Sequence, residues 1–223
     1  MTAKAHGGME AYSAKEGEYF SNARRDYVSE LPPETGTKIL EIGCGGGATG
    51  ALALQEKKCS VYCGVELSPS AAERARGKIT QVVAGDVEKI ELPWAPGTFD
   101  VLILSEVLEH LVDPWAVLKK LRPLIKSGGR VLASSPNVAH YKTLLMLFRG
   151  NWMLTDSGLM DRTHLRWFTP ISYRELFESS GFQVDLVRTL TPLTRKRCVA
   201  NLLTLGRLEH LFIVQIDLRA HCI

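Results

Sequence analysis

The feature that most constrains this chain is residues 39–50, Ile-Leu-Glu-Ile-Gly-Cys-Gly-Gly-Gly-Ala-Thr-Gly. Its apolar beginning, Ile39, Leu40 and Ile42, predicts a buried parallel strand, and the glycines that follow cannot continue that strand. Glycine tolerates positive φ and lets the backbone approach a ligand closely. A helix is expected over residues 49–57, with its N-terminal N–H groups pointing at the contents of the turn. Strand, glycine turn and helix together indicate a nucleotide-type pocket.

The glycines fit the dinucleotide-binding fingerprint, and Glu66 follows them at about the 20-residue spacing that this fingerprint requires. A nicotinamide-dependent oxidoreductase is therefore one interpretation. Glu41 favours another, because a buried carboxylate needs a cationic or donor partner and would repel a pyrophosphate. The pattern Glu-x-Gly-x-Gly-x-Gly resembles the first motif of class I S-adenosylmethionine-dependent methyltransferases. This resemblance implies that S-adenosylmethionine binds at Gly43, Gly45 and Gly47, with its ammonium group near Glu41.

Length and composition indicate a single domain with a full α/β core, because 223 residues with 45% apolar and 23% charged side chains suffice for one. The first 18 residues lack the apolar stretch of a secretory signal, and no apolar run reaches the length of a membrane span. The five cysteines form no CxxC pair and no disulfide-like framework. We therefore expect a cytoplasmic protein without a membrane span.

Charge is spread unevenly along the chain. Residues 1–120 carry 13 basic and 17 acidic side chains, a net charge of −4, whereas residues 121–223 carry 14 and 7, a net charge of +7. If the second half supplies a substrate cap, this asymmetry favours an anionic substrate, and a solvated basic face is the alternative. With a total net charge of only +3, nucleic acid is not an expected partner.

Strands alternate with helices as far as Pro136. The predicted strands after the first cover residues 60–66, 79–84, 99–104 and 130–134, and the predicted helices cover residues 16–31, 69–76 and 114–125, with a short helical turn at 105–111. The nearly continuous apolar run at 99–104 is typical of a central strand buried on both faces. The alternation predicts an α/β fold with a doubly wound, mostly parallel sheet.

Beyond Pro136 the regular alternation of strands and helices ends. Residues 138–150 are expected to be helical, and residues 151–168 form a polar, aromatic segment without a clear period, which is more often functional than idle. The remaining predicted helices cover residues 170–180 and 193–205, and the remaining strands cover residues 182–188 and 211–218. The resemblance implies a seven-stranded, Rossmann-like sheet with an antiparallel final strand.

The whole chain is thus predicted to be one methyltransferase domain with four parts. These parts are an N-terminal helical segment (1–36), a cofactor-binding core (37–136), a helical or irregular substrate cap (137–170) and C-terminal helices and strands (171–223).

Polar side chains follow the predicted strands at their carboxyl ends, where ligands of open α/β sheets lie. Glu66 can accept two hydrogen bonds from ribose hydroxyls, and the alternative is a charge stabilised by a helix N-terminus. Asp86 resembles the adenine contact of the family, and a plain Gly-Asp turn is the alternative. The resemblance also places Leu67, Val87 and Ser105 at the cofactor.

Residues 106–114, Glu-Val-Leu-Glu-His-Leu-Val-Asp-Pro, form the second most specific stretch. On a helix, Glu106, Glu109 and His110 would share one face. Glu-x-x-Glu-His after the fourth strand resembles a subset of the superfamily that includes ubiquinone-pathway O-methyltransferases and small-RNA 2′-O-methyltransferases. The alternative is one carboxylate that caps the turn and a histidine that packs beneath the cofactor.

A third stretch, residues 161–169, holds His164 between two arginines. It resembles a segment of the same O-methyltransferases and one of methyltransferases from bacterial surface-polysaccharide clusters. The resemblance implies a divalent cation, Mg²⁺, Mn²⁺ or Zn²⁺, bound by Glu106, Glu109, His110 and His164. A structural role for His164 is the alternative.

Methyl transfer from a sulfonium is an in-line displacement, in which an enzyme mainly positions the methyl group against the nucleophile. An alcohol acceptor also needs a base with a pKa near neutrality, and His110 and His164 are the candidate catalytic residues. The sequence therefore predicts O-methylation of a hydroxylated small molecule or glycan intermediate. A NAD(P)-dependent oxidoreductase and a non-catalytic binding module of the same fold stay open. Monomer and homodimer also stay open, because residues 138–148 are rich in apolar side chains.

Overall fold

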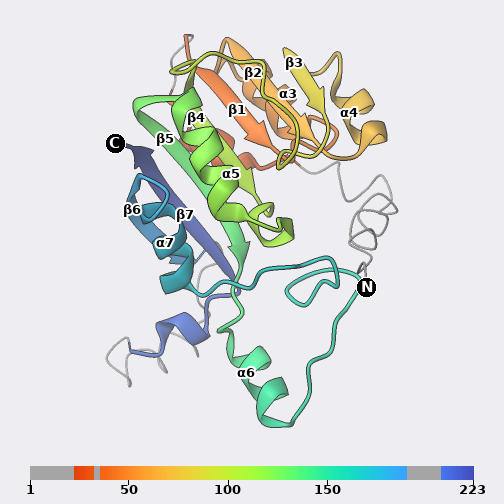
Figure 1. Cartoon of the computed structure of the whole chain (residues 1–223), viewed down its shortest axis with the longest axis vertical. Coiled ribbons are helices and arrows are strands. Elements are labelled where there is room, and N and C mark those ends of the chain that lie inside the picture. The colour runs from red at the N-terminus through yellow and green to blue at the C-terminus, as the bar shows by residue number, and fades with distance from the viewer. Residues whose placement is uncertain (1–22, 33–35, 190–206) are drawn as a thin grey trace.

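The computed structural model describes residues 23–32, 36–189 and 207–223. Seven strands form one sheet in the order β3-β2-β1-β4-β5-β7-β6, with helices on both of its faces (Figure 1). The strands are β1 (Lys38–Ile42), β2 (Val61–Glu66), β3 (Gln81–Ala84), β4 (Phe99–Ser105), β5 (Ile125–Pro136), β6 (Phe182–Thr189) and β7 (Gln215–Cys222). β7 runs antiparallel to β5 and β6, and every other pair in the sheet is parallel. The predicted α/β sheet with an antiparallel final strand is thereby confirmed.

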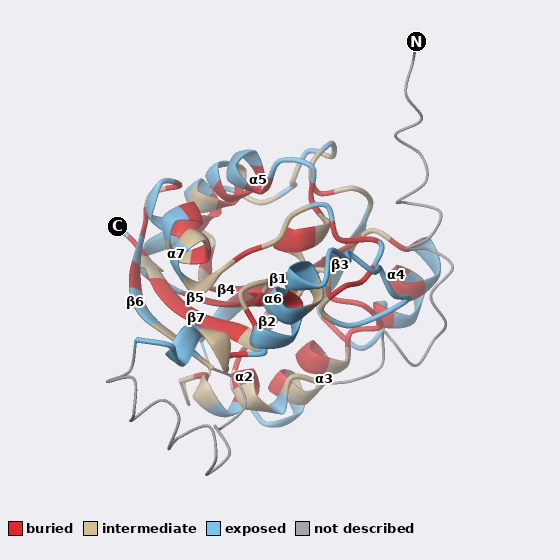
Figure 2. Cartoon of the chain, turned by 90° about the horizontal axis from the view of Figure 1, so that it is seen from below, coloured by how far each residue is buried: buried red, intermediate tan, exposed pale blue. Residues whose placement is uncertain are grey.

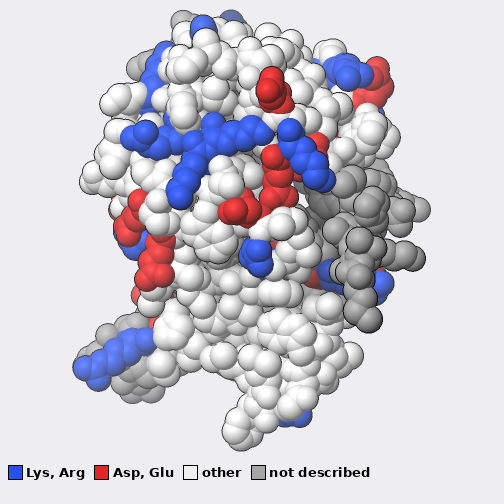
Figure 3. Space-filling model, in the orientation of Figure 1, with Lys and Arg blue, Asp and Glu red and all other residues white. Residues whose placement is uncertain are grey.

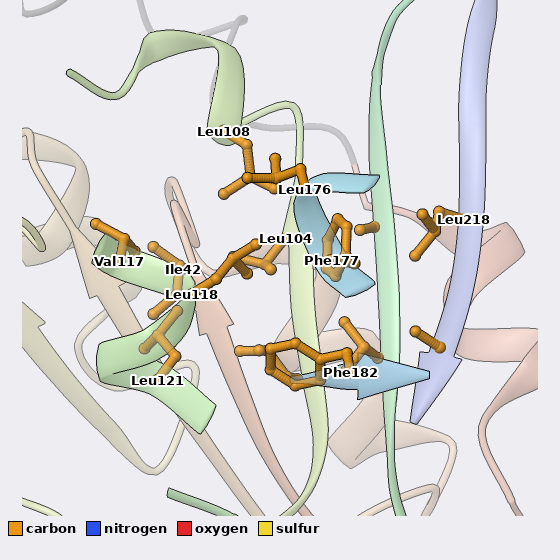
Figure 4. Close-up of a cluster of buried hydrophobic side chains, with 14 of the residues drawn as sticks. Ile42, Leu104, Leu108, Val117, Leu118, Leu121, Leu176, Phe177, Phe182 and Leu218 are labelled. Carbon is orange, nitrogen blue, oxygen red and sulfur yellow. The ribbon is translucent and has the colours of Figure 1, made fainter. Parts of the chain in front are cut away.

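Two apolar layers bury the central strands. The helices are α2 (Arg25–Glu30), α3 (Ala48–Gln55), α4 (Pro69–Ala75), α5 (Pro114–Leu121), α6 (Tyr141–Phe148) and α7 (Pro170–Glu178). Leu40 and Ile42 of β1 face the layer under α5 and α7, whereas Ile39 faces the layer under α2 and α3. Figure 4 shows Val117 and Leu118 of α5 and Phe177 of α7 in the first layer, and Figure 2 shows the buried strands between helices that are exposed on their outer sides.

Proline and a polar cap fix the start of three helices. α4, α5 and α7 each begin with proline, which needs no backbone hydrogen bond at that position. Asp113 accepts a hydrogen bond from Ala116 N at 2.9 Å, and Thr169 forms a reciprocal capping box with Ser172. These local signals are the reason that the predicted helix starts at residues 69, 114 and 170 are confirmed.

The predicted strand at residues 211–218 is wrong in its position. Glu209–Leu211 forms a 3-10 turn, and the strand is Gln215–Cys222. The strand was predicted too early in the chain because residues 211–214 are all apolar. Asp217 and Arg219 of the true strand are buried in an ion pair, which hydrophobic periodicity does not reveal. β5 is also longer than predicted. Ile125 pairs with Phe99 of β4 ahead of a register shift, and Ser135 and Pro136 continue the pairing with β7.

Two predicted helices lie partly or wholly outside the residues that the structure describes. Of the helix predicted at residues 16–31, the structure describes only the part from residue 23 on, where α2 forms. The helix predicted at residues 193–205 lies outside the described residues. No helix in the described part of the chain is both long and apolar enough to cross a membrane.

The cap predicted at residues 137–170 consists of α6 and a segment with only isolated bridges, as expected for an irregular stretch. Asn137 is fully buried and donates to the carbonyl oxygens of His210 and Ile213, at 2.7 Å each, so the cap begins tied to the C-terminal segment. α6 projects from the body and is largely free of charged side chains on the face in Figure 3. Phe148 at its end is 89% exposed.

Candidate active site

A cavity of about 430 Å³ opens at the carboxyl ends of β1, β4 and β5. Its walls are the glycine turn after β1, the turn after β4, the segment that precedes α2, and residues 158–164 of the cap. Eight predicted site residues line it, namely Glu41, Gly43, Gly45, Ser105, Glu106, Glu109, His110 and His164. Gly47, Glu66, Leu67, Asp86 and Val87 do not. The fold thus joins the glycine turn and both histidines in one site.

The glycine turn has a backbone that other residues adopt only with strain. Gly43, Gly45 and Gly47 have φ values of 72°, 53° and 76°, in the left-handed region. A Cβ atom on Gly43 would lie 2.6 Å from Cγ2 of Val107, another cavity residue. Glycine at position 43 therefore lets the turn after β4 approach the turn after β1.

Glu41 is a buried carboxylate in the cavity wall. Its Oε2 accepts a hydrogen bond from the Tyr62 hydroxyl at 2.8 Å. Burial raises the pKa of Glu41 to about 7, and the Tyr62 hydrogen bond opposes part of that rise. A cationic group of a ligand would favour the ionised form. Tyr62, which the sequence analysis missed, is identified only by the pairing of β2 with β1.

Glu66 connects the glycine turn to α4. Its two carboxylate oxygens accept hydrogen bonds from Gly45 N and Ser68 N, each at 2.8 Å. The side chain is fully buried, and burial raises its pKa. Each oxygen has a second lone pair. A ribose contact by Glu66 stays a prediction, because the carboxylate is behind the turn rather than on the cavity wall.

The remaining predicted cofactor residues, Leu67, Asp86 and Val87, do not line the cavity. Asp86 forms an ion pair with Lys89 at 2.8 Å and accepts a hydrogen bond from Glu88 N at 3.0 Å, the geometry of the plain-turn alternative. Val87 packs in the apolar core, and Leu67 is partly buried. Their roles at adenine also stay predictions.

The turn after β4 differs from the predicted helix. Only Leu108–His110 is helical, as one 3-10 turn, and Glu106 precedes it with a φ of 54°. This left-handed backbone is uncommon outside glycine and is concentrated at functional sites. The shared helix face expected for Glu106, Glu109 and His110 is therefore absent, although all three side chains reach the same cavity.

Glu109, His110 and His164 come together without a helix face. Each offers one ligand atom, and these atoms all lie within 4.8 Å of one another. The two imidazole rings meet edge to face, with centroids 4.8 Å apart. The cap delivers His164, because the backbone N–H groups of Leu165 and Arg166 donate to the Glu109 carbonyl at 2.8 and 3.0 Å.

Hydrogen bonds to backbone carbonyls indicate the tautomer of both histidines. Nδ1 of His110 lies 3.2 Å from the Thr163 carbonyl oxygen, and Nδ1 of His164 lies 3.1 Å from that of Leu159. A carbonyl oxygen only accepts, so Nδ1 carries a hydrogen in each ring, and in the neutral form of the ring Nε2 carries the lone pair. Metal-binding histidines are commonly held in this way.

The carboxylates of Glu106 and Glu109 suit a cation. Burial raises the pKa of both groups, that of Glu109 well above its usual range. Oε2 of Glu109 accepts from the Ser135 hydroxyl at 3.2 Å. Oε1 of Glu106 and of Glu109 is buried and accepts no hydrogen bond from any residue that the structure describes. Buried carboxylate oxygens of this kind need a donor or a positive charge.

Arg24 is the second residue that sequence reasoning missed. It lines the cavity from just before α2, donates to the hydroxyls of Ser105 and Ser134, and forms an ion pair with Asp26 at 2.7 Å. Among the described residues that line the cavity, it is the only lysine or arginine. No motif surrounds it in the sequence, so only the fold reveals its position.

The sheet topology, the glycine turn and the acidic residue at the end of β1 define a class I methyltransferase fold. A sequence model described as "methyltransferase domain" matches residues 16–187, and the chain belongs to this family. It is thus an S-adenosylmethionine-dependent methyltransferase, and the family match decides against a nicotinamide-dependent oxidoreductase.

Relatives named as methyltransferases support this class, and solved structures share the fold. A ubiquinone biosynthesis O-methyltransferase of Pseudomonas aeruginosa is 30% identical over 185 residues, which cover 80% of this chain and 79% of the relative. One of Thiobacillus denitrificans is 29% identical, covering 77% and 76%. A methyltransferase structure from Archaeoglobus fulgidus aligns with a TM-score of 0.66 at 20% identity, covering 92% of this chain and 96% of the other. The [4+2]-cyclase SpnF has a TM-score of 0.61 at 15% identity, covering 94% and 85%.

Proposed function

We propose that this protein transfers a methyl group from S-adenosylmethionine to a hydroxyl group of a small molecule or glycan intermediate. The observation that carries the proposal is the meeting of Glu109, His110 and His164 in the same cavity as the glycine turn. Such a cluster is suited to removing the proton of a hydroxyl group, or to holding a cation that would stabilise the negative charge left on its oxygen. Relatives of about 30% identity are named as O-methyltransferases, which supports the choice of oxygen.

The cavity residues fit the amino-acid end of the cofactor. The ionised carboxylate of Glu41 would meet the ammonium group, and the guanidinium of Arg24 would meet the carboxylate. The backbone of Gly43 and Gly45 leaves room for a ligand in the turn. When bound, S-adenosylmethionine supplies a methyl group on a positively charged sulfur, which makes the thioether a good leaving group.

Glu109, His110 and His164 also fit a divalent cation, with Glu106 as the proposed fourth ligand from the same turn. Their ligand atoms lie up to 4.8 Å apart, slightly wider than the about 4.2 Å between opposite ligands of an ion with bonds of about 2.1 Å. Binding of an ion would require these ligand atoms to move slightly closer together. A bound ion would lower the pKa of the hydroxyl to be methylated. Without an ion, Nε2 of His110 or His164 is the base that receives the proton.

The nature of the acceptor follows from the charges of the cavity. Apart from Arg24, its charged residues are carboxylates, so an anionic group on the acceptor would need Arg24 or a bound cation as its partner. We therefore favour an acceptor with neighbouring hydroxyls, as in a sugar or catechol, over one recognised by its negative charge.

The organisation of the chain as one domain and its cytoplasmic location complete the proposal. The described strands form one sheet, and four cysteines in the described part are buried free thiols, as a reducing compartment permits. The exposed apolar residues of α6, among them Phe148, allow either a monomer or a homodimer.

A non-catalytic module or a different chemistry is the second candidate, because SpnF has the same fold and is described as a [4+2]-cyclase. Calorimetry with S-adenosylhomocysteine and with NAD, followed by methyl transfer to a simple catechol, tests the proposal. We expect binding of the first ligand only and release of S-adenosylhomocysteine during turnover. Binding without transfer to any hydroxylated acceptor would favour the second candidate.

Replacing Gly43 with alanine should weaken the binding of S-adenosylhomocysteine by roughly tenfold to a hundredfold, because the new Cβ displaces Val107 within the cavity wall. Gly128→Ala is the matched control. Gly128 has a φ of 73°, nothing within 4 Å of its Cβ position, and a place near the amino end of β5. Both positions have a left-handed φ, so both variants carry backbone strain. Equal affinity of the two for the ligand, measured by calorimetry, would contradict the prediction.

Replacing Glu66 with alanine should cost about 1–3 kcal/mol of cofactor affinity, if its carboxylate also accepts from ribose hydroxyls. Because the same change frees Gly45 N, affinity alone does not separate the two roles. The decisive measurement compares 5′-methylthioadenosine with its 2′-deoxy analogue. The parent should prefer the ribose form, Glu66→Ala should lose this preference, and Asp86→Ala should keep it while weakening adenine binding by less. If Glu66→Ala still prefers the ribose form, Glu66 does not contact the ribose and its role is structural.

A further inference from the structure

The ring of Tyr27 lies against two guanidinium groups, those of Arg24 at the cavity and Arg219 of β7. Tyr27 is on α2 and is fully buried. The guanidinium carbon of Arg24 lies 3.8 Å from its ring centroid, and that of Arg219 lies 4.9 Å from it. Both distances fall within the range of cation–π attraction. One aromatic ring thus contacts a cavity residue and a residue of β7.

Arg219 is held in place by two carboxylates. Its Nε and Nη2 donate to the two oxygens of Glu30, at 2.6 and 3.0 Å, and its Nη1 donates to Asp217 at 2.6 Å. Asp217 is fully buried and also accepts from Arg188 Nε at 2.9 Å. Glu30 is the last residue of α2. The two-pronged pair therefore fixes the C-terminal end of α2 to β7.

Arg24 occupies the opposite end of the same helix. Its backbone N–H donates to the Thr49 hydroxyl at 3.2 Å, and its side chain donates to Ser105, Ser134 and Asp26. Four of its five side-chain N–H groups are used in this way within the described structure, which leaves one on Nη2. Arg24 lines the cavity, so this N–H is the side-chain donor that remains for a carboxylate that enters it.

Packing of α2 does not require these charges. Tyr27, Val28 and Leu31 already bury apolar surface against the sheet, and a buried ion pair adds little net stability over apolar residues of similar size. The main effect of the Glu30–Arg219 pair is therefore to fix the position of α2 against β7. The cavity depends on that geometry, because Arg24 is its only cationic side chain of the lysine or arginine type among the described residues.

We infer that Tyr27, Glu30 and Arg219 are positioning residues, which hold the guanidinium of Arg24 where it receives the carboxylate of the methionyl group. The inference rests on the proposed function, because it requires S-adenosylmethionine in the cavity. Glu30 and Arg219 fix the helix, Tyr27 transmits the position through its ring, and Arg24 makes the contact. The three residues touch neither the acceptor nor the reacting methyl group.

The test compares two ligands that differ in the methionyl end. S-adenosylhomocysteine has the carboxylate, and 5′-methylthioadenosine lacks it. In Arg219→Met, Tyr27→Leu and the milder Glu30→Gln, we expect the affinity for the first ligand to fall by about tenfold and that for the second to change by less than about twofold. Tyr27→Phe keeps the ring and should behave as the parent. Arg174→Met removes an exposed ion pair with Glu178 of α7, outside this network, and should also leave both affinities unchanged.

A double-mutant cycle separates positioning from general loosening. Arg24→Ala should lose the same selectivity for the carboxylate, and Arg219→Met in that background should cause no further loss. Equal losses for both ligands in the folded variants, or no loss for S-adenosylhomocysteine, would overturn the inference. A parent protein that binds neither ligand would instead overturn the proposed function, and the inference with it.

Discussion

Replacing Glu41 with glutamine is expected to weaken the binding of S-adenosylmethionine by about 2–5 kcal/mol, or roughly thirtyfold to several-thousandfold. The amide oxygen can still accept the Tyr62 hydrogen bond, so the packing around residue 41 is conserved. Only the negative charge is lost, and the ligand ammonium group then enters a buried cavity without its partner. Calorimetry at about pH 8, where the parent carboxylate is ionised, measures the effect.

The control ligand is 5′-methylthioadenosine, which has no ammonium group. Its affinity should change by less than about threefold in Glu41→Gln, because the adenosine half of the pocket is untouched. A similar loss for both ligands would mean that residue 41 acts through the shape of the turn. No loss for either would remove Glu41 from the site.

The same charge makes binding depend on pH. Burial raises the pKa of Glu41 to about 7 in the ligand-free protein. Between its ordinary value of 4.5 and about 7, the folded protein keeps a proton that the unfolded chain releases, so the free energy of unfolding falls as pH rises through this window. Ligand binding has the opposite sign, because the ammonium group needs the ionised carboxylate. Affinity should fall about thirtyfold from about pH 8 to about pH 5.5 in the parent and stay nearly constant in Glu41→Gln.

The part of the site that could be predicted from the sequence is the part made by contiguous residues. Glu41 and the glycines lie in one strand and turn, so the residues that shape the pocket are also neighbours in the chain. The buried parallel strands were equally predictable, because strands covered on both faces are continuous apolar runs, as in β4. Proline and polar caps marked the starts of α4, α5 and α7.

Tyr62 and Arg24 could not be predicted, because their roles depend on packing between distant segments. Tyr62 reaches Glu41 through the register of β1 and β2, and Arg24 reaches Ser105 and Ser134 across the edge of the sheet. The periodicity of apolar residues along the chain predicts neither the register of paired strands nor the position of a helix against the sheet. The displaced boundary of β7 has a related origin, since Asp217 and Arg219 are charged residues that only tertiary ion pairs allow inside.

The convergence of His164 with Glu109 and His110 was predicted for a reason that the structure corrects. A helix face was expected to align Glu106, Glu109 and His110, whereas the chain uses a 3-10 turn after a left-handed residue. The residues nevertheless meet, because the cap is hydrogen-bonded to the Glu109 carbonyl and places His164 against His110. Matching residue types thus located the cluster, and the backbone that builds it was visible only in three dimensions.

Removal of divalent cations is expected to lower the rate of methyl transfer by at least about a hundredfold, because the site would lose the charge that stabilises an alkoxide. The protein is stripped with a chelator and titrated with Mg²⁺, Mn²⁺ and Zn²⁺ in an assay of methyl transfer to a catechol. One carboxylate and two imidazoles in the observed cluster pull the preference toward Zn²⁺, and a contribution from Glu106 would shift it toward Mg²⁺ or Mn²⁺.

The variant His164→Ala removes the ligand that the cap delivers and should weaken metal binding and turnover together. His221→Ala is its matched control, because that histidine pairs with Asp185 on the β6–β7 side of the sheet, away from the cavity. S-adenosylhomocysteine should bind the parent, the stripped protein and both variants alike, which separates metal loss from unfolding. If chelation leaves turnover unchanged and His164→Ala still transfers methyl groups, the metal proposal is wrong. His110, with Nδ1 donating to Thr163 and Nε2 carrying the lone pair, then becomes the simpler general base.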